Sequence, residues 1–72
     1  MKILKINPHL IFVPELQIND IIEVGTNEEL VVVGTFKQGR LVTRTLVTKQ
    51  PVNVPCEATT RVRKLGYLVN QE

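Results

Sequence analysis

Short runs of β-branched and aliphatic residues, bounded by proline, glycine and asparagine, recur along the chain at intervals of about 8–12 residues. This spacing is typical of short strands in a small sandwich or barrel, and no long stretch shows the apolar stripe of a helix. The pattern predicts strands over Lys2–Ile6, Leu10–Val13, Ile21–Val24, Leu30–Phe36, Leu41–Thr48, Val52–Val54 and Thr60–Leu65, with a stub at Tyr67–Val69. The four prolines fall between these runs, where a missing donor costs no ladder hydrogen bond.

The clearest local prediction is a hairpin that joins Leu30–Phe36 to Leu41–Thr48. Its turn, Lys37-Gln38-Gly39-Arg40, places a glycine where a short loop needs a positive φ. A second turn, at 25–28, would add Ile21–Val24 and complete a three-stranded meander.

The first strand of this hairpin has two unusual features. Leu30 to Val33 is apolar on both faces, so we expect it to be covered twice, by barrel closure or by a subunit contact. Gly34 follows directly and predicts a bulge or bend that would let a small sheet close.

Two segments resemble SH3-like modules. Leu16 to Val24 is similar to the segment leading into the first barrel strand, with a tight turn ending in Asp20 and with Asn19 where glycine is usual. Val54 to Ala58, followed by Val62 and Leu65, is similar to the short 3₁₀ turn and last strand that close such barrels. The resemblance implies a small antiparallel barrel over residues 1–72, with at most one short helical turn, near Cys56–Ala58. It does not imply proline-rich ligands, because the aromatic residues that bind them are absent.

A second resemblance covers the first half of the chain. Val13-Pro14-Glu15-Leu16, Asp20 to Val24 and Leu30 to Val33 are similar to the swapped-hairpin transcription factors of the AbrB and MazE type. This alternative implies an obligate DNA-binding dimer, although the helical turn that follows the proline element in that family has no room here.

Charge is distributed unevenly along the chain. Residues 1–36 carry two cations and five acids, a net −3, whereas residues 37–64 carry seven cations and one acid, a net +6. Such asymmetry concerns partners, because a basic segment attracts polyanions. A solvated surface would normally mix both signs. The candidate polyanion-binding residues are Lys37, Arg40, Arg44, Arg61, Arg63 and Lys64.

Other chemistry finds little support in the sequence. The chain has no serine, and its single cysteine, Cys56, is typical of a packing residue more than of a nucleophile. One histidine, His9, and one cysteine cannot hold a metal within one chain. The glycines stand singly, so no phosphate loop is formed. We therefore expect no enzymatic activity, no cofactor and no metal.

Two classes of partner remain. The first is nucleic acid, DNA or RNA, held through its backbone, since the few aromatic residues give little base stacking. The alternative is a protein partner, bound by a small adaptor or inhibitor of the phage type through a charged face or an edge strand such as Leu41–Thr48. The marginal core of so small a domain favours a homo-oligomer. The single cysteine and the short N-terminal apolar stretch predict a cytoplasmic protein with no membrane segment.

Overall fold

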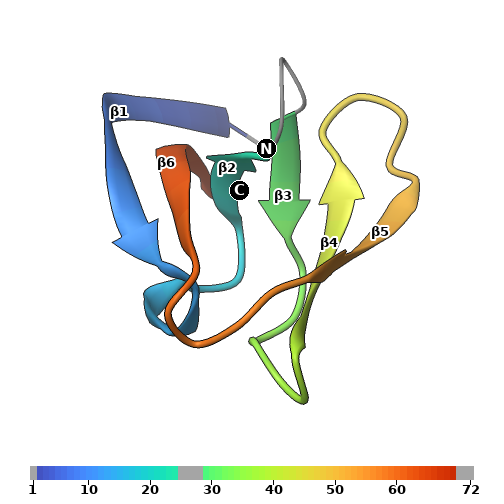
Figure 1. Ribbon diagram of the computed structural model, residues 1–72. Coiled ribbons are helices and arrows are strands. Elements are labelled where there is room, and N and C mark those ends of the chain that lie inside the picture. Colours follow the sequence, from blue (N-terminus) through green and yellow to red (C-terminus); the bar gives the residue numbers. More distant parts are fainter. Residues whose placement is uncertain (1, 25–28, 70–72) are drawn as a thin grey trace.

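The computed structural model describes residues 2–24 and 29–69, which form one antiparallel sheet of six strands (Figure 1). The strands are β1 (Lys2–Phe12), β2 (Asp20–Glu23), β3 (Glu29–Val32), β4 (Arg40–Thr45), β5 (Pro51–Pro55) and β6 (Arg61–Val69), and one 3₁₀ turn, η1 (Val13–Glu15), follows β1. The order across the sheet is β1-β6-β2-β3-β4-β5. The all-β prediction is therefore confirmed.

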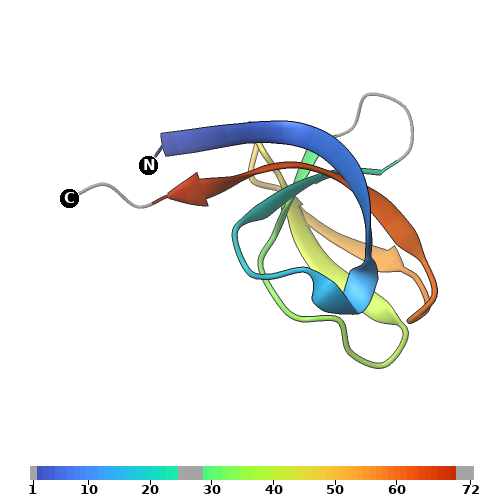
Figure 2. The same cartoon turned by 90° about the vertical axis from the view of Figure 1, so that its left-hand side faces the viewer.

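The sheet is strongly curled but open (Figures 1 and 2). β1 and β5 form its two edges, and no pairing joins them among the described residues, so barrel closure is not confirmed. One chain supplies all six strands, and the strand-exchanged dimer of the alternative prediction is not needed to complete this sheet. The prediction that Leu41–Thr48 forms an edge strand is wrong, because β4 pairs with both β3 and β5.

The β3–β4 hairpin is confirmed. Lys37 and Arg40 exchange main-chain hydrogen bonds of 3.0 and 3.2 Å, and the two residues between them both have positive φ, 51° at Gln38 and 78° at Gly39. This combination is typical of the type I′ turn, whose twist matches that of paired strands. The predicted turn at 25–28 lies outside the described residues.

Two further local predictions are confirmed. The N–H groups of Val33 and Gly34 both donate to the carbonyl oxygen of Val42, at 3.0 and 3.2 Å, which is a bulge at the predicted glycine. Asn19 has a φ of 80° in the tight turn that ends at Asp20, as its tolerance of the left-handed region led us to expect. Asp20 is the first residue of β2.

The helical turn predicted near Cys56–Ala58 is wrong. That segment forms a β-turn, in which the Thr60 N–H donates to the Glu57 carbonyl at 3.0 Å and the Glu57 N–H donates to the Thr60 hydroxyl at 2.9 Å. The 3₁₀ turn lies instead at η1, where proline favours the first turn of a helix.

The predicted breaks at Pro8 and Gly66 are also wrong, since both residues lie inside continuous strands. Pro8 lies in the edge strand β1, where the pairing with β6 shifts register between Lys5 and His9. Gly66 pairs with Lys5 on one side and with Ile21 on the other. A Cβ at this position would collide with the Leu4 carbonyl oxygen, so glycine is what allows β1 to approach β6.

Apolar side chains pack on both faces of the central strands. One cluster lies in the curl of the sheet and contains the buried residues Val13, Leu16, Ile22, Leu30, Val32, Leu41 and Val62. The second lies on the opposite face and contains Ile21, Val31 and Leu68. The double coverage predicted for residues 30–33 is confirmed for 30–32 within one chain, whereas Val33 is 39% exposed.

Candidate functional site

The structure divides the six candidate cations into two groups. Lys37, Arg40 and Arg44 lie on β4 and on the turn that leads into it, whereas Arg61, Arg63 and Lys64 lie on β6. β2 and β3 separate β4 from β6, which at a strand spacing of about 4.8 Å places the two groups about 14 Å apart along a row of paired residues. The six residues therefore do not form one contiguous stripe.

The β4 group lies on one face of its strand. Arg40, Val42 and Arg44 alternate with the buried Leu41 and Thr43, so they project from the opposite side of the sheet. The two arginines are separated by about 13 Å along the strand, at roughly 3.3 Å per residue. Lys37 extends the series at the hairpin turn, and we call Lys37, Arg40 and Arg44 the β4 basic face.

No acid lies in this part of the chain. Neither β4 nor β5 contains an aspartate or glutamate, and none occurs anywhere between Leu30 and Cys56. No ion pair found among the described residues involves the β4 basic face. Its positive potential is therefore not neutralised by a neighbour on the same two strands.

A shallow hollow lies beside the hairpin turn. It has a volume of about 280 Å³ and is lined by Thr35, Lys37, Gln38, Arg40, Val42 and Asn53. Two of these side chains are cationic, and the hydroxyl and the two amides can also donate hydrogen bonds. This combination suits an oxyanion such as a phosphate group.

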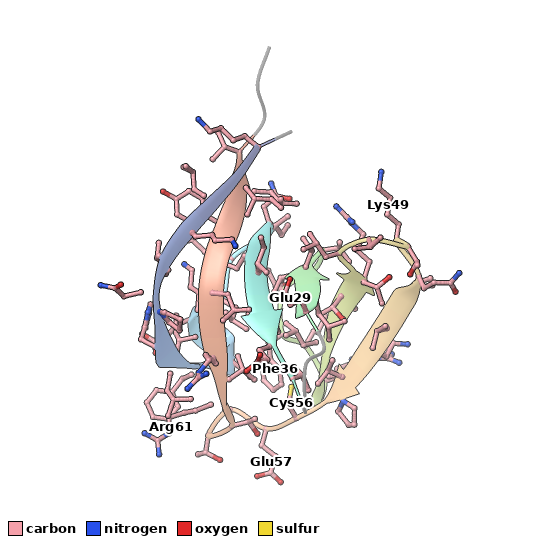
Figure 3. The ribbon with its side chains drawn as sticks, turned by 90° about the horizontal axis from the view of Figure 1, so that it is seen from above. Glu29, Phe36, Lys49, Cys56, Glu57 and Arg61 are labelled. Carbon is pink, nitrogen blue, oxygen red and sulfur yellow. The ribbon has the colours of Figure 1, made fainter. Side chains whose placement is uncertain are left out.

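Sequence reasoning left Lys49 and Asn53 out of the site. Lys49 lies in the turn between β4 and β5 with a φ of 60°, exposed and directed away from the sheet, on the side of the molecule opposite Arg61 (Figure 3). Asn53 pairs with Val42 across the sheet. The signal that would have found Lys49 is its position inside the same acid-free stretch as the β4 basic face.

In the β6 group, Lys64 is engaged by an acid inside the fold. Its Nζ lies 3.2 Å from Asp20 Oδ1, and the two side chains are only 20% and 6% exposed. The other oxygen of this carboxylate accepts a 2.8 Å hydrogen bond from the Gln17 N–H. The Lys64 ammonium also lies 5.8 Å from the centre of the Tyr67 ring. Lys64 therefore contributes chiefly to folding.

The two arginines of β6 are more exposed. Arg63 Nη1 lies 3.8 Å from Glu23 Oε1 in a weak surface pair. The Arg61 guanidinium lies over the ring of Phe12, 5.7 Å from its centre. Both side chains project from the same face of β6, away from the buried Val62.

A larger hollow of about 450 Å³ lies at the second apolar cluster. Its lining is formed by Ile3, Lys5, Ile6, Pro8, Ile21, Glu29, Leu46 and Leu65. One cation and one acid offset each other in an otherwise apolar lining, so this hollow is a poorer match for a polyanion than the hollow beside the hairpin turn.

Neither Cys56 nor His9 lines either of these two hollows. The cysteine is half-buried against the first apolar cluster, and burial raises the pKa of its thiol, which keeps it protonated at neutral pH. His9 Nδ1 lies 3.3 Å from the Asn7 carbonyl oxygen at the β1 bulge. Within residues 2–24 and 29–69, no three His, Cys, Asp or Glu side chains converge as a metal site requires. No helix in the same residues has the length and apolarity needed to span a membrane.

Comparison of the chain with protein-family models, with curated proteins and with solved structures found no match.

Proposed function

We propose that this chain is a non-enzymatic binding module that holds nucleic-acid phosphates on the β4 basic face. The observation that carries the proposal is the hollow beside the hairpin turn, whose lining includes both Lys37 and Arg40 and which lies next to a pair of strands, β4 and β5, without acids. Phosphate contacts of this kind supply affinity without reading sequence. Arg44 and Lys49 extend the contact along the β4–β5 hairpin.

The β6 cations have a secondary role in this proposal. Arg61 and Arg63 add to the general attraction of a polyanion, whereas Lys64 is held by Asp20. Stacking on bases makes a minor contribution, because Phe36 is half-buried and Tyr67 lies on β6, apart from the β4 basic face.

The scaffold that we propose for this function is SH3-like. Strands β2 to β5 form a continuous meander, and β6 returns to pair with β2, which gives the order β6-β2-β3-β4-β5. β1 would then be an addition to that scaffold, paired with the outer side of β6.

Anisotropy titrations with duplex DNA, single-stranded DNA and RNA test this function. If four cations neutralise phosphates on duplex DNA, log K falls against log salt with a slope of about −3 to −4 between about 50 and 200 mM salt. The double variant Lys37→Ala/Arg40→Ala is expected to weaken binding evenly across sequences and to reduce this slope by about two.

A matched control removes the same charge from the far edge of the sheet. Lys2→Ala/Lys5→Ala changes two exposed residues of β1 and should have a much smaller effect. Equal losses in both double variants would show that only net charge matters. Absence of binding to all three nucleic acids at low salt would refute the proposal.

A further inference from the structure

The two edges of the sheet differ in the main-chain groups that they present. In an antiparallel ladder, successive residues direct their N–H and C=O groups alternately toward one neighbour and away from it. A hydrogen bond at one position therefore fixes which residues of an edge strand face outward.

β5 is poorly suited to accept another strand. The Thr45 N–H donates to the Gln50 carbonyl at 2.9 Å, and the Cys56 N–H donates to the Gly39 carbonyl at 3.0 Å. By alternation, Val52 and Val54 direct their main-chain N–H and C=O groups toward β4. The main-chain groups of Pro51, Asn53 and Pro55 point outward. Proline has no N–H, so Asn53 supplies the one outward donor among the residues of β5.

The end of β1 is open in comparison. The Val13 N–H donates to the Thr60 carbonyl at 2.9 Å. By alternation, the main-chain groups of Ile11 and His9 point toward β6, and the N–H and C=O groups of Leu10 and Phe12 point outward. β1 lies on the outer side of β6 along its whole length (Figure 2). Two donors and two acceptors are thus in position to pair with an added strand.

The same two residues expose apolar side chains. Leu10 is 60% exposed and Phe12 is 45% exposed. Their cross-strand partners on β6 are Arg63 and Arg61, and the Arg61 guanidinium lies over the Phe12 ring. An added strand would therefore lie against an apolar pair with two cations behind it.

The positive charge of β1 and β6 decides which kind of strand can be added at this edge. β1 and β6 together contain five cations and no acid, and although Glu23 and Asp20 of β2 pair with Arg63 and Lys64, no ion pair among the described residues involves Lys2, Lys5 or Arg61. If a second copy of this chain paired through the same edge, the positively charged β1 and β6 strands of both copies would lie close together, which is unfavourable. A strand rich in acidic side chains complements both the main-chain groups and the charge.

We propose that the outer edge of β1, at Leu10–Phe12, binds an extended acidic segment of a partner protein as an added strand. This edge is separate from the β4 basic face, and the inference does not depend on nucleic-acid binding.

A labelled peptide of alternating glutamate and valine is the probe, and anisotropy is the measurement. The full chain should bind it more tightly than a matched peptide in which lysine replaces glutamate. Arg61→Glu should reduce this preference between the two peptides.

The main-chain contact is isolated by comparing Phe12→Pro with Phe12→Ala. Both variants remove the ring, but only proline removes the outward N–H, and Phe12 already has the φ of −70° that proline adopts. We expect the proline variant to bind about fivefold more weakly than the alanine variant, which is the effect of one hydrogen bond.

A second measurement tests the same contact without altering the protein. Glutamate–valine peptides that are N-methylated at all residues of one parity lose the donors of one edge, so one of the two methylated forms should lose binding and the other should retain it. Equal binding by the alanine and proline variants together with equal binding by both methylated peptides would overturn the proposal. Equal binding of the glutamate and lysine peptides would also overturn it, as would a concentration-dependent dimer that Phe12→Pro abolishes.

Discussion

Lys64 Nζ lies 3.2 Å from Asp20 Oδ1, so a largely buried ion pair joins β6 to the start of β2. Asp20 has two partners in this arrangement, because its second oxygen accepts the Gln17 N–H at 2.8 Å. The pair connects residues far apart in sequence and fixes the turn at Asn19 against the returning strand.

Removing the carboxylate should therefore be costly. Asp20→Ala leaves a largely buried ammonium and the Gln17 N–H without their acceptor, and we expect a loss of about 3 kcal/mol in the free energy of unfolding. Urea denaturation measures this loss. Lys49→Ala, at an exposed cation for which the described part of the chain offers no such pair, should change the free energy by less than about 0.5 kcal/mol. Similar losses at both positions would contradict a structural role for the ion pair.

Gly66→Ala should disrupt the β1–β6 pairing. The new Cβ would meet the Leu4 carbonyl oxygen and lie 3.1 Å from the Cα of Lys5, and backbone atoms cannot move aside as a flexible side chain can. We expect a loss of more than about 3 kcal/mol in the free energy of unfolding, measured by thermal or urea denaturation. Gly34→Ala is the matched control, since its Cβ would meet only the Val42 side chain, at 3.3 Å, and should cost less. The reverse order of the two effects would be inconsistent with the packing of Gly66.

The β3–β4 turn can be improved. Gln38 has a φ of 51° at the first central position of the type I′ turn, where asparagine is preferred before glycine. Gln38→Asn should raise the free energy of unfolding by about 0.5–1 kcal/mol, because asparagine tolerates the left-handed region better. Gln50→Asn, at an exposed residue without a positive φ, should have little effect. A destabilised Gln38→Asn variant would mean that the turn has another conformation.

Cys56 should be a poor nucleophile. Burial raises the pKa of its thiol, so at any pH below that pKa the folded protein holds less thiolate than the unfolded chain does. Reaction with iodoacetamide near neutral pH should be slower in the native protein than in concentrated urea, with glutathione as the reference thiol in both solvents. The same shift means that stability is fully present below the pKa of the unfolded thiol and falls as the pH rises above it. A native thiol that reacts faster than the unfolded one would indicate an activated cysteine.

Cys56→Ala provides the functional test of this residue. The variant should keep whatever binding the wild type shows and lose at most about 2 kcal/mol of stability, since the side chain is only half-buried. A folded variant without binding would imply a thiol-dependent mechanism.

The local turns of this fold were predictable because each depends on a few adjacent residues. Gly39, Asn19 and Gly34 all adopt conformations that their own backbone preferences permit. The burial of Leu30 to Val32 on both faces of the sheet was also predictable, since an apolar run must be covered on both faces.

Long-range pairing was not predictable in the same way. Pro8 and Gly66 look like breaks, yet an edge strand tolerates a proline and a close neighbouring strand requires a glycine. The division of the six cations into two groups depends on β2 and β3 lying between β4 and β6, which no local pattern reveals. The ion pair between Lys64 and Asp20 was not predictable for the same reason, because it depends on β6 returning to lie beside β2.

The pairing of β1 with β6 also governs the order in which the chain can assemble. Among the described residues β1 pairs only with β6, the last of the six strands in sequence, so this pairing cannot form until β6 has been synthesised. β2 to β5 pair as neighbours in sequence and can form while β1 is still alone. Contacts of such large sequence separation slow folding. During that delay, Pro8, which has no N–H to donate, and the lysines at positions 2 and 5 hinder β1 from joining a strand of another nascent chain.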